Sequence, residues 1–282
     1  IRTARAAVPF ALAALLYALY SRIDIIMLHR IIGAEQTAYY AVAFRVIETT
    51  FVIATMTGIA MFPELAAGGR EGTSLRRLIL VDALRWLSVL GALVAVGLFV
   101  SGDRLIILVF GAELAPAGDL IRLMAILVVI GYAKEPLWRL LISQRREMLR
   151  LYIQAPAVLF NIVLNLLLIP RYGAMGAVLA SVVSEMLMLL GFAVAALRAG
   201  WLNYARIGGW SAAVMAACLI GSELKSIIEP LLAGAVAVIV LAMLLVVFRV
   251  IAVDEVVALV RKVGRRGNPS ISIGSKREEK NL

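Results

Sequence analysis

The chain has 282 residues, of which 63% are hydrophobic, and its mean hydropathy is +0.97. A soluble globular domain is nearer half apolar, so this composition predicts an integral membrane protein. The formal charge of +10 does not indicate nucleic acid, because Lys and Arg gather in the cytoplasmic loops of membrane proteins and face anionic lipid. A single cysteine, Cys218, and a single histidine, His29, exclude a disulfide framework and a Cys- or His-rich metal site.

Apolar runs of the length that crosses a bilayer as a helix, about 20 residues, recur along the chain. Eight spans are predicted, of which the seventh is short: 6–31, 37–62, 77–100, 119–142, 151–169, 173–197, 208–222 and 229–251. Between the third and fourth spans, residues 101–118 hold an apolar run too short to cross, which we expect at the membrane interface or as a cap on the bundle.

The predicted fold class is all-α integral membrane, with about eight transmembrane helices. A six-helix unit is expected over residues 1–197, an appended helix pair over 198–253, and a basic cytoplasmic tail over 254–282. The helix pair differs from the first six spans, since 208–222 and 230–248 contain no ionisable group. The tail is too polar to bury a core and is expected to be disordered.

The loops predict the orientation of the spans. With the N-terminus inside, the outside segments carry few basic residues, namely Arg30, Arg104, Arg171 and Lys225. The inside segments carry Arg2, Arg5, Arg70, Arg76, Arg77, Arg145, Arg146, Arg150, Arg198, Arg206 and the basic tail. This asymmetry agrees with the positive-inside rule and places both termini in the cytoplasm.

Charged residues inside the predicted spans are the strongest functional signal. Four basic residues lie deep in the spans: Arg22, Arg45, Arg85 and Lys134. Each costs about 2.5–3.5 kcal/mol at the centre of a helix in lipid, so these side chains must face away from lipid. Acidic residues accompany them: Asp24, Glu48, Asp82, Glu135 and Glu185. Three further arginines near span ends, Arg122, Arg139 and Arg249, are explained by snorkelling.

Two interpretations of these charges compete. In one, interhelical ion pairs hold the bundle together and do nothing else. In the other, which we favour, the first six spans surround a charged, water-filled cavity, because pairing alone does not easily satisfy so many groups on so many helices. Arg22 and Asp24 are two residues apart and point in different directions, so at least one of them needs a partner on another helix or in water.

Helical spacing places several of these groups on shared faces. Arg45 and Glu48 are three residues apart and share a face, and Asp82 and Arg85 repeat that spacing. Two asparagines of the fifth span, Asn161 and Asn165, are four apart on one face. An arginine-rich cavity suits an anionic ligand, since guanidinium presents forked donors that match phosphate oxygens. The carboxylates would balance that charge or bind a coupling cation.

In the sixth span, small residues every four positions favour close helix packing, as at Gly173, Ala177 and Ser181, with Glu185 next on the same stripe. The chain has no G-x-x-x-x-G-K-[ST] loop, no H-E-x-x-H motif and no Ser/His or paired-carboxylate arrangement that would specify an enzyme. We therefore expect no enzymatic activity, no cofactor and no metal.

Several stretches resemble a known family. "YSRIDIIMLHRIIGAEQTAYYAVAFRVIE" (20–48) contains R-x-D-x-x-M-L, then Gly, then Y-x-x-A-x-R. "ILVFGAEL" (107–114) and "NIVLNLLLIPRYGAMGAVLASVVSE" (161–185) follow in order. Together they are similar to the C-terminal lobe of polysaccharide (O-antigen type) flippases, in the multidrug/oligosaccharidyl-lipid/polysaccharide exporter superfamily.

The resemblance implies two six-helix lobes around a central cavity in the bacterial inner membrane. It implies a substrate of undecaprenyl-pyrophosphate-linked sugar in lipopolysaccharide or other surface-polysaccharide biosynthesis, with a polymerase and glycosyltransferases as partners. Arg22, Arg45, Arg85 and Lys134 would bind the pyrophosphate. Asp24, Glu48, Asp82, Glu135 and Glu185 would balance charge or couple an ion, and Asn161 and Asn165 would line the sugar path. The N-terminal lobe is missing, so the chain is expected to be a fragment or to pair with another chain.

Three alternatives stay open at this point. A peptidoglycan-precursor flippase and a drug/cation antiporter share the architecture, although an antiporter should favour acids over arginines in its cavity. A non-transporting scaffold in polysaccharide assembly would not need buried Arg45 or Arg85 and should tolerate their replacement by leucine.

Overall fold

The computed structural model describes residues 15, 18, 20–66, 72–201, 236–239 and 241, with the backbone alone over 72–75. The regular structure in these residues is helical, which confirms the all-α class. A first helix covers 20–32. It is followed by α2 (Ala34–Ala66), α3 (Gly72–Phe110), the 3-10 turn η1 (Ala112–Leu114), α4 (Ala117–Ser143) and α5 (Glu147–Arg198).

Three of the described helical segments are long and apolar enough to cross a membrane, namely Ala34–Ala66, Arg76–Phe110 and Glu147–Arg198. The predicted spans 37–62, 77–100, 119–142, 151–169 and 173–197 each fall within a described helix. The first span is described mainly from residue 20, the seventh lies outside the described residues, and the eighth is represented only by 236–239 and 241. The count of eight therefore stays a prediction.

The segment 101–118 belongs in part to α3, and its expected place at the membrane interface or as a cap on the bundle stays a prediction. Residues 101–110 continue α3 as regular helix, and only Gly111 and η1 break the chain before α4 begins at Ala117. The helix continues through Gly102 and ends before Gly111, which adopts a φ of 95°.

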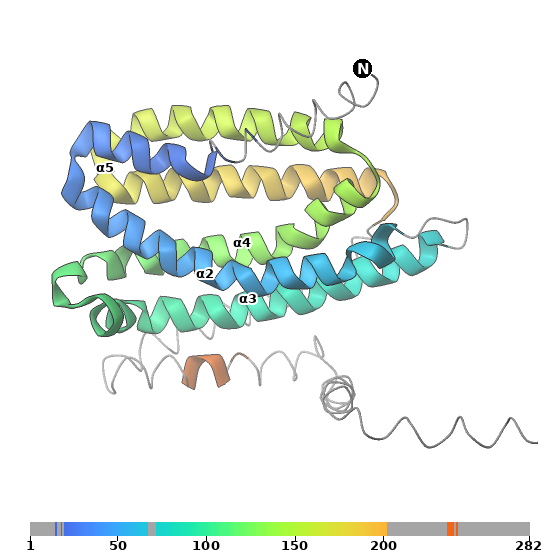
Figure 1. The fold of residues 1–282 in the computed structure, drawn as a ribbon, viewed down its shortest axis with the longest axis horizontal. Helices are drawn as coiled ribbons and strands as arrows, with labels where there is room; N and C mark the ends of the chain where they lie inside the picture. The colour runs from blue at the N-terminus through green and yellow to red at the C-terminus, as the bar shows by residue number, and fades with distance from the viewer. Residues whose placement is uncertain are drawn as a thin grey trace, which may run out of the picture.

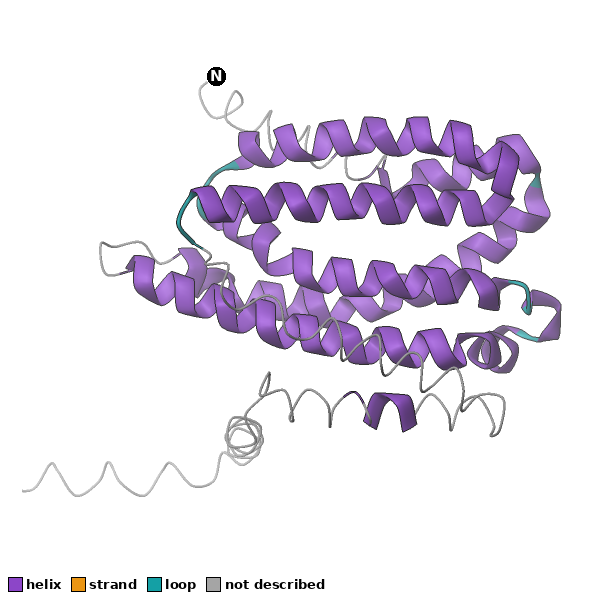
Figure 2. Ribbon diagram, turned by 180° about the vertical axis from the view of Figure 1, so that it is seen from behind, coloured by secondary structure: helices purple, strands orange, loops and turns teal. Residues whose placement is uncertain are grey.

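Glycines at two positive-φ positions fold the chain back on itself. Gly33 (φ 91°) separates the helix 20–32 from α2. Gly173 (φ 59°, ψ −138°) breaks α5 into two halves, which lie side by side and antiparallel in Figures 1 and 2. At this break the side-chain oxygen of Gln36 accepts a hydrogen bond of 3.0 Å from the N–H of Ala174, which would otherwise be one of the unpaired donors at a helix start. The predicted fifth and sixth spans are thus the two halves of α5.

Most small residues of the sixth span are buried, and Gly176 lies against the first half of α5. Ala177, Ala180 and Ser184 are fully buried, and a Cβ on Gly176 would collide with the backbone carbonyl of Leu168 in the first half. The predicted close packing is therefore present.

Helix α4 is the central element of the described bundle, since it packs most extensively against α3, α2 and α5. Its buried side chains include Ile121, Met124, Val128 and Tyr132. The ionisable residues of α4, among them Lys134 and Glu135, thus belong to an interior helix rather than to one that faces lipid.

Candidate functional site

The buried carboxylate of Asp24 is the best-connected polar group of the interior. Its Oδ1 accepts a hydrogen bond of 2.6 Å from Asn165 Nδ2, and its Oδ2 accepts bonds from Tyr40 OH (2.9 Å) and Ser181 Oγ (2.6 Å). Asp24 is 8% exposed, so these three donors replace the water that the carboxylate loses on burial. Four helical segments supply the cluster: residues 20–32, α2 and the two halves of α5.

The two asparagines of the predicted fifth span extend this cluster. Asn165 Nδ2 also donates to Asn161 Oδ1 at 3.0 Å, and both residues are fully buried. Asn161 Nδ2 and Asn165 Oδ1 are buried without a hydrogen-bond partner. The cluster therefore retains one donor and one acceptor that can bind a further polar group.

A cavity of about 160 Å³ lies beside Asp24 and is walled by the helix 20–32, α2, α4 and the second half of α5. This is room for several water molecules. Its ionisable lining consists of four carboxyl groups and one amine, together with Tyr20: Asp24, Glu48, Lys134, Glu135 and Glu185. The cavity is therefore a chamber rich in carboxylates, with aromatic walls at Phe44 and Phe51.

Ion pairs neutralise part of that lining. Lys134 on α4 pairs with Glu185 on α5, and their side chains are 17% and 15% exposed. One residue further on, Glu135 Oε1 lies 2.6 Å from Arg139 Nε within α4. The structure thus has features of both the ion-pair and the cavity interpretation of the charged residues, because ion pairs and a polar cavity lie in the same region.

The arginines assigned to the pyrophosphate lie elsewhere. Arg22 is exposed, and Arg45 is 69% exposed and lies 3.4 Å from Glu48. Arg85 is half-buried, with its guanidinium carbon 6.0 Å from the centre of the Trp86 ring, and Asp82 is exposed. None of these three arginines is among the residues that line the cavity described above. Their roles in binding pyrophosphate therefore stay predictions. A site built from them would lie on the outer face of the helices.

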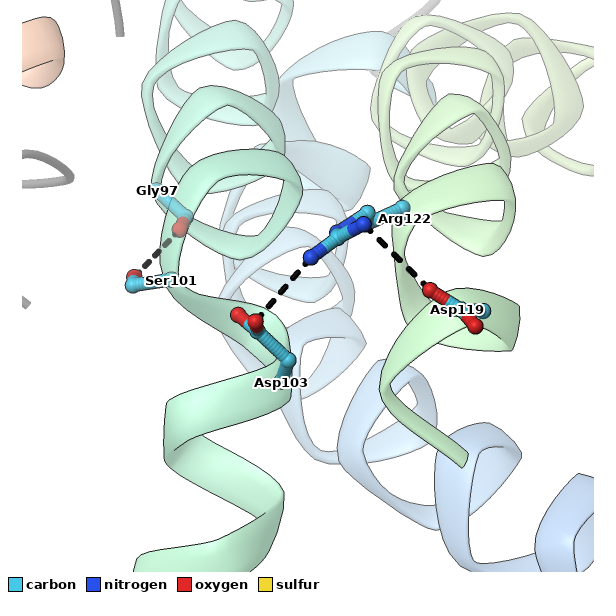
Figure 3. Close-up of polar contacts among 5 residues, drawn as sticks. All are labelled: Gly97, Ser101, Asp103, Asp119 and Arg122. Atoms are coloured by element: carbon cyan, nitrogen blue, oxygen red, sulfur yellow. Dashed lines mark hydrogen bonds and ion pairs between the residues drawn. The ribbon is translucent and has the colours of Figure 1, made fainter. Parts of the chain in front are cut away.

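The span-end arginine on α4 does not need to snorkel. Arg122 bridges α3 and α4, with Nη2 3.0 Å from Asp103 Oδ2 and Nη1 3.3 Å from Asp119 Oδ1 (Figure 3). Arg139 likewise pairs with Glu135. The snorkelling interpretation is replaced by ion pairs for these two, and Arg249 lies outside the described residues.

Sequence reasoning missed the partners of Asp24. Tyr40 entered only as part of a motif, and Ser181 only as one small residue in a packing stripe. A hydroxyl that follows Gly173 and Ala177 on a stripe of small residues is the signal that could have marked Ser181, because a buried hydroxyl needs a partner.

The geometry defines a helical membrane bundle with a polar, partly charged interior. The sequence profile of the MatE family matches residues 9–167, which is more than half of the chain. The chain therefore belongs to the MatE family, within the multidrug/oligosaccharidyl-lipid/polysaccharide exporter superfamily, whose members are membrane transporters rather than enzymes. No curated protein matches the chain in a sequence comparison.

Proposed function

We propose that this chain is part of a transporter that moves undecaprenyl-pyrophosphate-linked oligosaccharide from the inner to the outer leaflet of the bacterial cytoplasmic membrane, in the biosynthesis of surface polysaccharide. The observation that carries the proposal is the exposure of Arg22 and Arg45 on helices that are mostly apolar. Facing lipid would cost each guanidinium about 2.5–3.5 kcal/mol, so this face needs water, a ligand or another protein surface.

A pyrophosphate suits that face. Guanidinium stays charged at any depth and binds phosphate oxygens in pairs. Arg22 and Arg45 would hold the pyrophosphate, with Arg85 adding positive charge, and a second lobe in the same or another chain would enclose the ligand. Lys134 stays proposed as a further contact, although it lines the Asp24 cavity and pairs with Glu185. Asn161 and Asn165 stay proposed for the sugar path, although their burial points to support of Asp24 as their first task.

The carboxylate-lined cavity supports a second candidate, a drug/cation antiporter. Asp24, Glu48, Glu135 and Glu185 outnumber the one amine in the lining, as expected for a chamber that takes up cations. In the flippase proposal the same carboxylates would couple export to a cation. The two candidates differ in which residues are indispensable.

Export in cells that depend on this chain for surface polysaccharide separates the candidates. We expect Arg22→Gln and Arg45→Gln to abolish surface polymer while the protein still inserts in the membrane. Arg22→Lys and Arg45→Lys should retain part of the export. Arg30→Gln is the matched control, since Arg30 is exposed on the same helix, near its end. Export that survives both Gln changes would contradict a pyrophosphate site. Loss of cation-driven drug efflux in Asp24→Asn, with efflux intact in both Gln variants, would favour the antiporter.

A further inference from the structure

Three chain segments meet at one end of the bundle, on the right in Figure 1: the end of α2, the turn between α4 and α5, and the end of α5. The side-chain amide of Gln144, in the turn, donates to the carbonyl of Leu65, near the end of α2, at 3.0 Å. The guanidinium of Arg146, at the start of α5, lies 4.8 Å from the ring of Trp201, just beyond its other end. The start of α3 adjoins them, since Arg76 Nε donates to the carbonyl of Leu65 at 3.2 Å. These segments carry four exposed arginines: Arg77, Arg145, Arg146 and Arg198.

Arg145 holds a backbone conformation that normally favours glycine. Its φ is 52°, and no other described non-glycine residue has a positive φ. The turn is fixed, since the N–H of Arg145 bonds to Ile142 O at 3.0 Å and that of Arg146 to Leu141 O at 2.9 Å. A bulky residue in this region is strained, and glycine would close the helix without that strain. An exposed arginine at such a position points to a task for its side chain.

The neighbouring guanidinium is fixed by a different contact. Trp201 is only 6% exposed, so it offers a rigid ring, and Arg146 stacks on it while remaining exposed itself. Two adjacent guanidinium groups are thus presented from a rigid corner. Within six residues of these four arginines along the chain lie three carboxylates, Glu71, Asp82 and Glu147, fewer than the arginines themselves, so these segments carry a net positive charge.

An apolar stripe runs from the same corner along the first half of α5. It begins at Met148, within one turn of Arg145, and continues through Tyr152, Leu159 and Val163, which are 46%, 68%, 65% and 51% exposed. These positions are spaced by 4, 7 and 4 residues and therefore share one helix face. This face has the length and character to lie against an acyl chain.

We propose that this corner binds the phosphate of an anionic phospholipid, with Arg145 and Arg146 on the headgroup and the Met148–Tyr152–Leu159 face along an acyl chain. Charge complementarity and the position of the arginines at the end of an apolar helix favour a lipid over a soluble anion. The site is independent of the transported substrate, since it lies at the end of the bundle and shares no residue with the Asp24 cavity.

Native mass spectrometry of the detergent-solubilised chain with dioleoylphosphatidylglycerol or dioleoylphosphatidylcholine tests the proposal. We expect retention of phosphatidylglycerol over phosphatidylcholine, with affinity reduced roughly fivefold in Arg145→Gly and little changed in Arg145→Lys. Arg145→Gly should also raise Tm, because it relieves the positive φ, so weaker lipid binding cannot be attributed to misfolding. Arg171→Gln, which removes one exposed arginine at the opposite end, should bind lipid as the unaltered chain does.

Three results would overturn the proposal. One is an unchanged affinity for phosphatidylglycerol in Arg145→Gly. Another is an equal loss in Arg171→Gln, which would reduce the effect to total charge. The third is competition by inorganic phosphate at the concentration of the lipid, which would assign the corner to a free anion.

Discussion

Asp24 and Arg22 are two residues apart on one helix, and the structure treats their charges in opposite ways. Asp24 turns inward, where Tyr40, Asn165 and Ser181 all donate to its carboxylate. Arg22 turns outward and is exposed, like Arg45 on the next helix. The comparison shows two solutions to the same problem, since a charge within an apolar helix must either be solvated by the bundle or face something other than lipid.

The two solutions have different consequences. A carboxylate enclosed by three donors is tied to the fold, so its replacement disturbs the packing of four helical segments. An exposed guanidinium contributes little to the fold, and under the proposed function it acts through what it meets outside the bundle. Stability measurements should therefore respond to the inner group, and transport measurements to the outer one.

The largest stability effect is expected for Asp24→Ala. The change leaves the donors of Tyr40, Asn165 and Ser181 without their acceptor, and we expect a loss of about 3 kcal/mol in the free energy of unfolding. Arg22→Ala, two residues away, should cost less than about 0.5 kcal/mol because it removes an exposed side chain. Unfolding of the purified protein in mixed detergent micelles measures both. An equal loss in the free energy of unfolding for the two variants would contradict the distinction between the inner Asp24 and the outer Arg22.

A smaller effect is expected from the ion pair of the cavity. Lys134→Met leaves Glu185 without its partner, and we expect a loss of about 2 kcal/mol, below the ~3–5 kcal/mol of a fully buried pair because water can enter the cavity. The double variant Lys134→Met/Glu185→Leu should recover most of that loss. The same unfolding assay, run as a double-mutant cycle, measures the coupling. Strictly additive costs would mean that the two groups do not interact.

The smallest effect is expected from the exposed pair of Arg45 and Glu48. Their side chains are 69% and 32% exposed and 3.4 Å apart, so solvent screens the attraction. Arg45→Gln should change the free energy of unfolding by less than about 0.5 kcal/mol, and Glu48→Gln should do the same. A loss above 2 kcal/mol in either would show that the pair of Arg45 and Glu48 is a structural element of the bundle.

The sequence predicted the elements of this fold better than their contacts. Helices at 37–62, 77–100, 119–142, 151–169 and 173–197 could be predicted from the length of their apolar runs. All but 119–142 lie in one of the three described helices that are long and apolar enough to cross a membrane. The sequence also predicted that Arg22 and Asp24 point apart, which follows from helical geometry. The donors to Asp24 could not be found in this way. Asn165 and Ser181 are 141 and 157 residues away, and only the packing of α5 against the first helix brings them together.

The kind of residue that lines the cavity could not be predicted from the sequence either. Counting charges predicted an arginine-rich chamber, whereas carboxylates line the cavity beside Asp24. The count of charged residues could not tell which of them point into the bundle. The composition of a span indicates depth in the membrane and not the direction in which a side chain points. A charge pattern therefore predicts that a helix needs a polar neighbour, and the tertiary structure decides which neighbour it has.

The central claim, that the face with Arg22 and Arg45 meets water and a phosphorylated ligand rather than lipid, is tested most directly by thiol accessibility in the membrane. In a Cys218→Ala background, Arg22→Cys and Arg45→Cys should react with a water-soluble thiol reagent about as fast as Arg171→Cys at a helix end. Leu159→Cys on the apolar face should stay unreactive. Added undecaprenyl pyrophosphate should slow the reaction at positions 22 and 45 only. If both positions are as unreactive as Leu159→Cys, they face lipid or a dry protein contact, and the claim is wrong.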